Sequence, residues 1–547
     1  MALSALLLTS LLSFFPRTTS SFLPARECPI LGPAYDRDFD LLPTEAFQAA
    51  KSSFSSKIES LFESGELNRT HSVFAIDVYS TYTNESIFNY FYTGSALKEG
   101  FPSGTMDDET VWRVGSVSKL FTLYAILAHA TRGVFEQPVT VFLPELKRGS
   151  SPEDKPLRWI DWDQITIGAL AAQQAGAGGM QFLKIMRDSK RPTAPPFSTA
   201  LYADGGWGAL GRVLERMTGL SYNDAIQQVL SKPLGLDHTS SYKPNGTEVN
   251  GMIVPDAISW GWDNQVTAPS GGIYSNCRDV RRMGLSILHS TLLDTTTTNW
   301  WMKPHSHTAS LTFSVGAPWE IYRLTLPVSS NSTRYRISDQ YTKGGGNDGY
   351  GTIAALSPDH GLGYTVFVGG PGSGSERWSL LEATGGTFVP AAELAGRENA
   401  RKLFAGTYVD KISKKGTNMT ITVDPDHPGL GIESLFLEGV DSLGSLSVGT
   451  AALPSENVTV RLYPAGLEED LGDGKVKKKY RAIPQSLPAD SRSKAEGGKK
   501  FFDVECQSWF SVGFSGALDE FVFTRVDGKV VEVRSVGAKA GMKRFGE

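Results

Sequence analysis

The sequence WRVGSVSKLFTLYAIL, at residues 112–127, places a serine and a lysine three positions apart at the start of an apolar pattern. From Ser118 onward, apolar residues recur at the spacing of one helix face, which predicts an amphipathic helix. Ser116 therefore lies at the N-terminus of that helix, and Lys119 lies one turn further along the same face. A serine hydroxyl becomes a good nucleophile when a base is held within hydrogen-bond distance. Ser116 and Lys119 are thus a candidate nucleophile and base.

Ser-x-x-Lys alone is a weak motif, and the chain contains it four times. Only the copy at Ser116 begins a predicted helix and is followed by two further motifs with suitable chemistry. The first is Tyr202-Ala203-Asp204, from which a glycine-rich turn leads into a helix. The second is Lys343-Gly344-Gly345-Gly346, predicted as a lysine near the start of a glycine-rich strand, where a substrate can approach the backbone closely. The ordered set is far more specific than any one part.

These motifs resemble the Ser-x-x-Lys, Tyr-x-Asn and Lys-Thr-Gly pattern of the serine β-lactamase family, class C type. That family includes penicillin-binding proteins, related esterases and secreted fungal hydrolases. The resemblance covers about residues 40–390, with further matching segments at 165–170, 232–239, 270–275 and 356–366. It implies an α+β fold of the β-lactamase/transpeptidase type: an antiparallel sheet flanked by helices, a mainly helical subdomain, and the site between them. A class A enzyme matches less well, because Ser-Asp-Asn does not occur in the sequence.

The resemblance also implies roles for the motif residues. Ser116 attacks a carbonyl carbon and forms an acyl-enzyme, while Lys119 and Tyr202 share the proton transfers. Lys343 orients the substrate and supplies positive potential near Tyr202. The backbone N–H groups of Ser116 and Gly346 form the oxyanion hole, where losing one donor lowers a rate about a hundredfold or more. The oxyanion and substrate-binding residues implied in this way are Gly346, Asp204, Gly344 and Gly345.

Two residues depart from the family pattern: Asp204 replaces the usual asparagine and Gly344 replaces the usual threonine. A carboxylate beside Lys119 favours the ammonium form, which is a poor base, and it also repels anionic substrates. Glycine at position 344 removes a hydroxyl that family members use to hold a substrate carboxylate, although Lys343 still favours one. We therefore expect a small, neutral ester or amide as substrate rather than an antibiotic.

Two other functions are compatible with the sequence. An acyltransferase of secondary metabolism would use the same nucleophile with a different acceptor alcohol. A catalytically silent binding protein would keep the fold, and Asp204 is the residue that favours this alternative. Other chemistries lack their motifs, since the sequence contains no Gly-x-Ser-x-Gly, no His-Glu-x-x-His, no Walker-type loop and no zinc spacing of cysteines. We expect no metal and no cofactor.

The bulk properties of the chain indicate a globular protein that is exported. Its 547 residues predict two or three domains, and a net charge of −5 gives no reason to expect nucleic acid as a partner. Residues 1–20 contain a short apolar run followed by Pro16 and small residues, which predicts a cleaved signal peptide. Because no other segment is apolar enough to span a membrane, we expect an extracellular protein without a membrane partner.

Six Asn-x-Ser/Thr sequons support secretion. They are Asn68, Asn84, Asn245, Asn331, Asn418 and Asn457. Asn84 falls between two alternating runs, 74–80 and 87–93, as the tip of a hairpin would. The three cysteines allow at most one intrachain disulfide, and the sequence leaves the pair open. They are Cys28, Cys277 and Cys506.

The order of elements divides the chain into regions. We predict a signal peptide at 1–20, an N-terminal segment at 21–43, a catalytic domain at 44–395 and a C-terminal domain at 400–547. Within the catalytic domain, helices are predicted at 44–65, 222–230 and 278–289, and strands near 311–325 and 351–368.

After residue 400 the pattern changes to strands and turns. Strands are predicted at 419–423, 458–463, 501–504 and 520–535, with a hairpin turn at 526–529. By resemblance to C-terminal extensions of the family, this region is expected to be a barrel-like antiparallel β domain. Two charged stretches, 475–479 and 486–500, are predicted as mobile loops.

Overall fold

The computed structural model of the protein describes residues 28–546 outside a few gaps. The gaps are residues 103, 148–156, 158–159, 178–190, 246–248, 256, 330–333, 413–415, 447–457, 487–505, 507, 511 and 514–515. The signal peptide at 1–20, the sequons at Asn331 and Asn457 and the strand at 501–504 lie outside the described residues, as does the stretch 487–500.

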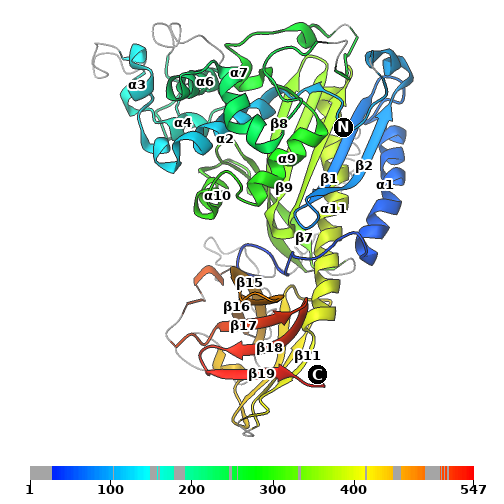
Figure 1. Ribbon diagram of the computed structural model, residues 1–547, viewed down its shortest axis with the longest axis vertical. Coiled ribbons are helices and arrows are strands. Elements are labelled where there is room, and N and C mark those ends of the chain that lie inside the picture. The colour runs from blue at the N-terminus through cyan, green and yellow to red at the C-terminus, as the bar shows by residue number, and fades with distance from the viewer. Residues whose placement is uncertain are drawn as a thin grey trace, which may run out of the picture.

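An antiparallel sheet in the order β2-β1-β10-β9-β8-β7-β6-β5 forms the centre of the larger part of the molecule (Figure 1). Its strands are β1 (Val73–Ser80), β2 (Glu85–Thr93), β5 (Ser306–His307), β6 (Phe313–Val315), β7 (Glu320–Pro327), β8 (Tyr335–Asn347), β9 (Tyr350–Ser357) and β10 (Leu362–Gly369). The predicted hairpin is present as β1 and β2, with Asn84 in the turn at φ 57°. Every residue of β1, β9 and β10 is buried, because helices cover both faces of the sheet.

Two helices lie side by side on one face of this sheet (Figure 1). The first, α1 (Glu45–Glu63), confirms the helix predicted at 44–65, and its N-cap Thr44 accepts a hydrogen bond from the Phe47 N–H. The second, α11 (Ser373–Phe404), packs against it, with the rings of Phe54 and Phe388 centred 5.4 Å apart. Such aromatic contacts contribute beyond the apolar area that they bury.

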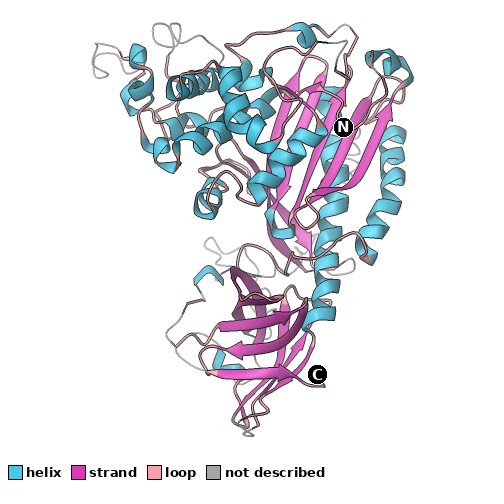
Figure 2. Ribbon diagram, in the orientation of Figure 1, coloured by secondary structure: helices cyan, strands magenta, loops and turns pink. Residues whose placement is uncertain are grey.

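The opposite face carries α9 (Cys277–Leu288), which confirms the helix predicted at 278–289, and a helical subdomain around α2 (Figure 2). The helix α2 (Ser118–Ala130) was expected to be amphipathic, but every residue from Ser118 to Leu127 is buried. It is a central helix, because other helices and the sheet surround it. The remaining α-helices in the described part of the chain are α3 (Val139–Phe142), α4 (Ile167–Ala171), α6 (Asp204–Thr218), α7 (Tyr222–Ile226), continued by a π-helical turn (Gln227–Ser231), α8 (Lys232–Leu234) and α10 (Thr295–Trp301).

The chain after α11 forms a β-barrel. Its strands are β11 (Gly406–Val409), β12 (Asn418–Thr422), β13 (Leu430–Leu437), β14 (Val440–Asp441), β15 (Val458–Asp470), β16 (Lys475–Ser486), β17 (Glu520–Val526), β18 (Lys529–Ser535) and β19 (Ala540–Arg544). The order β12-β11-β19-β18-β17-β16-β15-β13 closes because β13 pairs back with β12. Asp527 and Gly528, at φ 49° and 77°, make the predicted hairpin turn between β17 and β18.

The prediction of a mobile loop at 475–479 is wrong, because these residues begin β16. Lys478 points inward and is buried, with its Nζ 3.0 Å from Asp36 Oδ1 and 3.0 Å from Glu468 Oε1. The lysines looked like a solvated run, yet one of them is neutralised by carboxylates from elsewhere in the fold.

One disulfide joins Cys28 to Cys506, and Cys277 is a buried free thiol. Asn68, Asn84 and Asn245 are exposed, whereas Asn418 is half-buried at the start of β12. Among the helices that the structure describes, none combines the length and the apolar character needed to cross a membrane.

Candidate active site

Ser116 lies in a short 3₁₀ turn, Gly115–Val117, between β3 (Trp112–Arg113) and α2. Gly115 has a φ of 52°, and a Cβ there would overlap the backbone nitrogen of Gly346. Glycine is therefore required both by the backbone conformation and by the close approach of another segment. The turn holds Ser116 at the beginning of the helix, as predicted, and against the end of β8.

Lys119, in the first turn of α2, has a fully buried side chain that meets three acceptors. Its Nζ lies 2.9 Å from Ser116 Oγ, 2.6 Å from Asp204 Oδ1 and 2.6 Å from the carbonyl oxygen of Ser270. An ammonium group has three N–H donors, so all of them are engaged. The Asp204 carboxylate supplies the counter-charge of this buried ammonium group.

Tyr202 approaches Ser116 from the solvent side. Its hydroxyl donates a hydrogen bond to Ser116 Oγ at 2.7 Å, and its side chain is 53% exposed. The Nζ atoms of Lys119 and Lys343 lie 5.0 and 5.6 Å from the centre of the Tyr202 ring. The structure thus brings together the serine, the phenol and both lysines named from the sequence.

The loop that carries Tyr202 is held by Gln173, a buried residue at φ 60°. Its side-chain Oε1 accepts a hydrogen bond from the Ala203 N–H at 2.8 Å, and its carbonyl accepts one from the Leu201 N–H at 2.7 Å. Bonds on both sides of Tyr202 fix the backbone that carries its side chain. An uncommon backbone conformation of this kind is retained only where the surroundings enforce it.

Lys343 lies in the last third of β8, not near the start of a strand as predicted. The strand begins at Tyr335, and its first half escaped prediction because it buries polar side chains instead of alternating apolar ones. The buried polar residues in this part include Arg336, Ser338 and Gln340.

The end of β8 extends beyond its neighbour, because β7 pairs with it only as far as Glu320 opposite Thr342. On this open edge the Gly344 N–H donates to Glu320 Oε2 at 2.8 Å. Residues two apart in a strand direct their N–H groups to the same edge, so the N–H of Gly346 faces this edge too.

Gly345 lets the end of β8 lie against the Ser116 turn. A Cβ at Gly345 would overlap the carbonyl oxygen of Val114 and would lie 3.0 Å from the Ser116 nitrogen. A larger residue would therefore separate the strand from the nucleophile.

Glu320, the first residue of β7, binds the end of β8 with both carboxylate oxygens. Oε1 lies 2.6 Å from Lys343 Nζ, and Oε2 accepts the Gly344 N–H. Lys343 is buried and also donates to the Gly344 carbonyl at 2.5 Å. The positive charge expected from Lys343 is therefore balanced by a carboxylate.

Four contributors to the site were missed by the sequence analysis: Gln173, the Ser270 carbonyl, Glu320 and Arg377. Ser270 stands in a segment that matched the family, so its place near the nucleophile could have been inferred. Glu320 belongs to no motif, and only the pairing of β7 with β8 brings it to Lys343. Arg377, near the start of α11, donates from Nη1 to the Gly345 carbonyl at 2.9 Å.

Within the described part of the chain, no group of three or more His, Cys, Asp or Glu side chains is arranged to hold a metal ion.

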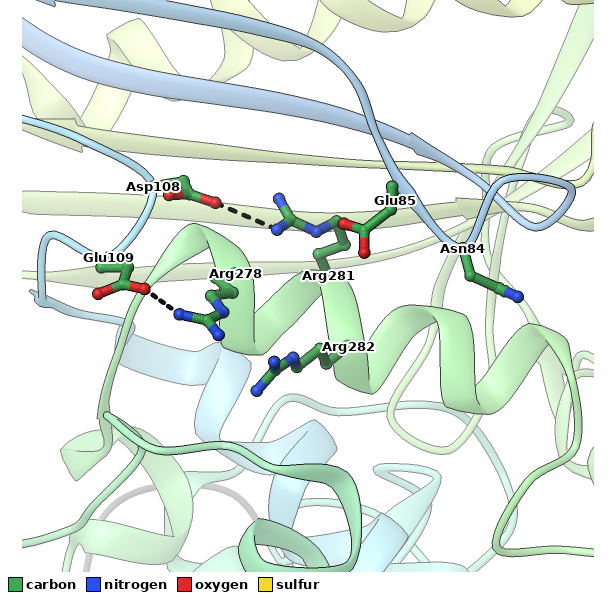
Figure 3. Close-up of a pocket in the computed structure, with 7 residues that line it drawn as sticks. All are labelled: Asn84, Glu85, Asp108, Glu109, Arg278, Arg281 and Arg282. Atoms are coloured by element: carbon green, nitrogen blue, oxygen red, sulfur yellow. Dashed lines mark hydrogen bonds and ion pairs between the residues drawn. The ribbon is translucent and has the colours of Figure 1, made fainter. Parts of the chain in front are cut away.

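Two cavities lie beside α9, and the four predicted catalytic residues line neither. The first, of about 300 Å³, is lined by Asn84, Glu85, Asp108, Glu109, Arg278, Arg281 and Arg282 (Figure 3). Its arginines have acidic partners: Arg281 pairs with Asp77 at 2.6 Å and with Asp108 at 3.1 Å. The second cavity, of about 430 Å³, shares Asn84 and Arg282 with the first. The ion pair of Arg281 with Asp77 holds α9 against β1.

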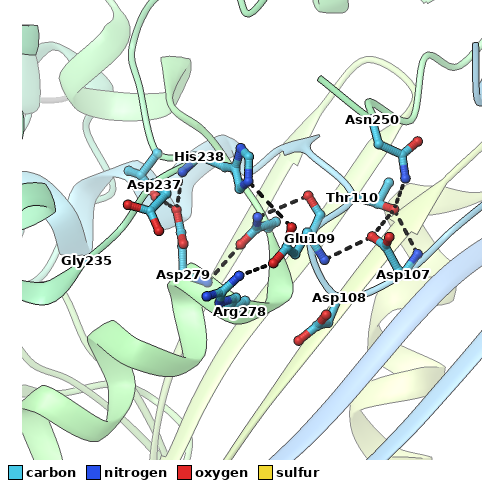
Figure 4. A network of polar contacts seen from close by, with 12 residues as sticks. Asp107, Asp108, Glu109, Thr110, Gly235, Asp237, His238, Asn250, Arg278 and Asp279 are labelled. Atoms are coloured by element: carbon cyan, nitrogen blue, oxygen red, sulfur yellow. Dashed lines mark hydrogen bonds and ion pairs between the residues drawn. The ribbon is translucent and has the colours of Figure 1, made fainter. Parts of the chain in front are cut away.

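A polar network next to the first cavity fixes the segment that leads to the Ser116 turn (Figure 4). Arg278 pairs with the side chain of Glu109, and Asn276 Nδ2 donates to the Glu109 carbonyl at 3.0 Å. Asn250 Nδ2 donates to Thr110 Oγ1 at 3.0 Å. These bonds anchor the residues just before β3 and so help to fix the position of Ser116.

Two family models match the chain. The model described as "Beta-lactamase" matches residues 77–383, and the one described as "Beta-lactamase-like-like, C-terminal domain" matches residues 396–545. A beta-lactamase-like protein of Arthroderma benhamiae is 26% identical, and the match covers 80% of this chain and 81% of the relative. A probable hydrolase of Phoma sp. is 25% identical, with 77% of this chain and 73% of the relative covered.

Solved structures include similar chains. A class C beta lactamase from Rhodobacter sphaeroides gives a TM-score of 0.47 at 20% identity and covers 62% of this chain and 99% of its own. An octameric penicillin-binding protein homologue from Pyrococcus abyssi gives a TM-score of 0.49 at 15% identity, and the match covers 79% of this chain and 95% of the homologue. The first family model spans more than half of the chain and includes Ser116, Tyr202 and Lys343, so the chain belongs to the beta-lactamase family.

Proposed function

We propose that the protein is a serine hydrolase that cleaves a neutral ester or amide through an acyl-enzyme on Ser116. One observation carries the proposal: Ser116 Oγ lies within hydrogen-bond distance of both Tyr202 Oη, at 2.7 Å, and Lys119 Nζ, at 2.9 Å. A nucleophile with two proton-handling groups at this range is the arrangement that covalent catalysis needs.

In acylation, Ser116 Oγ attacks the carbonyl carbon, and the serine proton moves to a neighbouring group as the C–O bond forms. The three donors of Lys119 are engaged, which leaves the Tyr202 oxygen as the better placed acceptor, and it takes the serine proton as a phenolate, after its own proton has passed to solvent on its exposed side. Tyr202 then returns the proton to the leaving alcohol or amine. During both proton transfers the Lys119 ammonium group stabilises the negative charge that develops on the oxygens of Ser116 and Tyr202. Water releases the acyl group by the same steps in reverse order.

The negative oxygen that develops during attack would be bound by the N–H groups of Ser116 and Gly346. The open edge of β8, beyond its pairing with β7, supports this assignment for Gly346. Donors fixed in place before the reaction stabilise such an oxygen without further reorganisation.

We also propose that the protein is secreted and N-glycosylated. The apolar run at residues 1–20 and the exposed sequons Asn68, Asn84 and Asn245 support this location.

The nucleophile is tested with a fluorescent alkyl phosphonate and a chromogenic neutral ester. We expect the wild type to bind one phosphonate per chain at Ser116, and Ser116→Ala to bind none and to lose at least about 10³-fold in kcat/KM. Ser53→Ala, on an exposed position of α1, is the matched control and should behave as wild type. Equal labelling of wild type and Ser116→Ala would exclude the proposal and favour a silent binding protein.

A further inference from the structure

Asn84 lines both of the cavities beside α9. It is exposed in the β1–β2 turn at φ 57°, and Asn84-Glu85-Ser86 is a glycosylation sequon. A glycan attached at this position would therefore begin at the edge of two existing cavities. Asn68, which is also an exposed sequon, lines neither of the two.

The amide group of Asn84 is held on the side of the second cavity. His289, which also lines that cavity, has its Nε2 at 2.6 Å from Asn84 Oδ1. Because an amide oxygen only accepts hydrogen bonds, the ring nitrogen donates here. N-glycosylation uses Nδ2 and leaves Oδ1 unchanged, so this bond persists when a sugar is attached. Figure 3 shows Asn84 at the edge of the first cavity, with its amide nitrogen directed away from the three arginines.

The second cavity has the size and the two kinds of lining that a sugar ring requires. Its volume of about 430 Å³ lies within the range of roughly 300–1,000 Å³ that is usual for small-molecule sites. Pro233, Leu234 and Leu285 supply apolar surface, while Arg282 and Thr291 supply hydrogen-bonding groups. A pyranose ring has C–H groups on its faces and hydroxyl groups around its rim. It can therefore pack against the leucines and bond to the polar side chains at the same time.

Arg282 has donors left for such a contact. Its Nη1 donates to the Gly235 carbonyl and lies 3.5 Å from Asp237 Oδ2. A guanidinium group carries five N–H donors, and both of these contacts are made by Nη1. The N–H groups of Nε and Nη2 are therefore available to sugar hydroxyls.

We propose that the cavity between the β1–β2 turn, α8 and α9 binds the first N-acetylglucosamine of a glycan on Asn84. The inference rests on the secretion and glycosylation proposed above and does not depend on the chemistry at Ser116. The bound sugar connects the β1–β2 turn of the sheet to α8 and α9, which no covalent link joins to it directly.

The rate at which a peptide N-glycosidase releases each glycan from the native protein tests this binding. The protein is secreted from a eukaryotic host, and the conversion of each asparagine to aspartate is followed by peptide mass spectrometry. We expect release from Asn84 to be at least about tenfold slower than release from Asn68, because a bound sugar must leave the cavity before the enzyme can act. After denaturation the two rates should be equal.

Two variants of the cavity separate binding from a merely crowded turn. Leu234→Asp removes part of the apolar wall, and Arg282→Ala removes polar groups on the other side. Each should raise the native release rate at Asn84 toward that at Asn68. Val141→Asp is the control, since Val141 is an exposed residue of α3 that does not line the cavity, and it should leave release at Asn84 slow. An unchanged rate at Asn68 shows that a variant keeps its fold.

Equal native rates at Asn84 and Asn68 in the wild type would overturn the inference. Slow release at Asn84 that neither cavity variant alters would overturn it as well, and so would an unmodified Asn84 beside a glycosylated Asn68. The absence of a glycan from every sequon is a separate result, which would contradict the proposed glycosylation and this inference together.

Discussion

Lys119 and Tyr202 contact the same oxygen of Ser116 from opposite environments. Lys119 is fully buried and is tied to Asp204 and Ser270, so its replacement would leave buried polar groups without a partner. Tyr202 is half exposed, and the hydrogen bond from its hydroxyl is to the nucleophile. Of these two residues, Tyr202 can therefore be changed with the smaller effect on the fold.

Tyr202→Phe should lower kcat/KM for a neutral ester by about 10²- to 10⁴-fold, because it removes the group that carries the serine proton. The free energy of unfolding should change by less than about 0.5 kcal/mol, as for most exposed sites. Tyr82→Phe is the matched control, since Tyr82 is also 53% exposed and lies on the β1–β2 turn. Full activity in Tyr202→Phe, measured by ester hydrolysis beside thermal unfolding, would exclude a catalytic phenol.

At the scale of elements, β8 and α11 are joined by a buried ionic cluster at the end away from Ser116. Arg336 of β8 donates to both carboxylate oxygens of Glu393 in α11, each at 2.8 Å, and also to Asp359 Oδ2 at 3.1 Å. His360 Nε2 lies 3.0 Å from Glu393 Oε2. Burial alone would raise the pKa of Glu393, but the charge and hydrogen bonds of Arg336, with the bond from His360, hold this pKa well below its ordinary value.

Glu393→Gln should lower the free energy of unfolding at pH 7 by about 3 kcal/mol, because it leaves Arg336 buried with half of its charge balance. A depressed pKa in the folded state means that the carboxylate stabilises the fold above the unfolded pKa of about 4.3. That contribution is lost as the pH falls toward the pKa of Glu393 in the folded protein. The difference in free energy of unfolding between wild type and variant should therefore become smaller below about pH 4.

Urea unfolding at pH 7 and pH 3 measures this gap. Glu398→Gln is the control on the same helix, because Glu398 pairs with the exposed Lys402 at 2.8 Å and should contribute less than about 1 kcal/mol. An equal gap at both pH values would show that the ionised carboxylate of Glu393 does not account for the loss.

At the scale of the whole molecule, the segment from Cys28 to the start of α1 ties the barrel to the larger part. Its carbonyl at Gly32 accepts a hydrogen bond from Arg336 at 3.2 Å, and its Asp36 pairs with Lys478 and Arg525 in the barrel. Tyr35 is buried with the barrel core and also packs against Gly396 of α11. The segment therefore contacts both parts, and α11 runs continuously from one to the other (Figure 1).

The disulfide between Cys28 and Cys506 should stabilise this arrangement, since it closes a loop with a sequence separation of 478. Replacing both cysteines with serine should lower the free energy of unfolding by about 2–4 kcal/mol. Thiol titration checks the pairing: the native protein should show no reactive thiol, because burial raises the pKa of Cys277 and shields it. The denatured, unreduced chain should show one thiol, and three there would exclude the disulfide.

The sequence by itself determined the family, the turn that carries the candidate nucleophile Ser116 and the helix that follows this turn. These features depend on residues close together in the chain, such as Ser116 with Lys119 and Tyr202 with Asp204. The hairpin at Asn84 and the turn at Asp527 were predicted for the same reason, since local backbone preferences specify them.

Only the tertiary structure decided which carboxylate balances the charge of Lys343, which cysteines pair and that residues 475–479 form a strand. Glu320 reaches Lys343 because β7 pairs with β8, and Lys478 is neutralised by Asp36, more than four hundred residues earlier in the chain. The sequence around a lysine does not identify a carboxylate partner that lies in a distant segment. A charged side chain looks solvated in sequence, and its burial is stable only when the fold supplies the opposite charge from a distant segment.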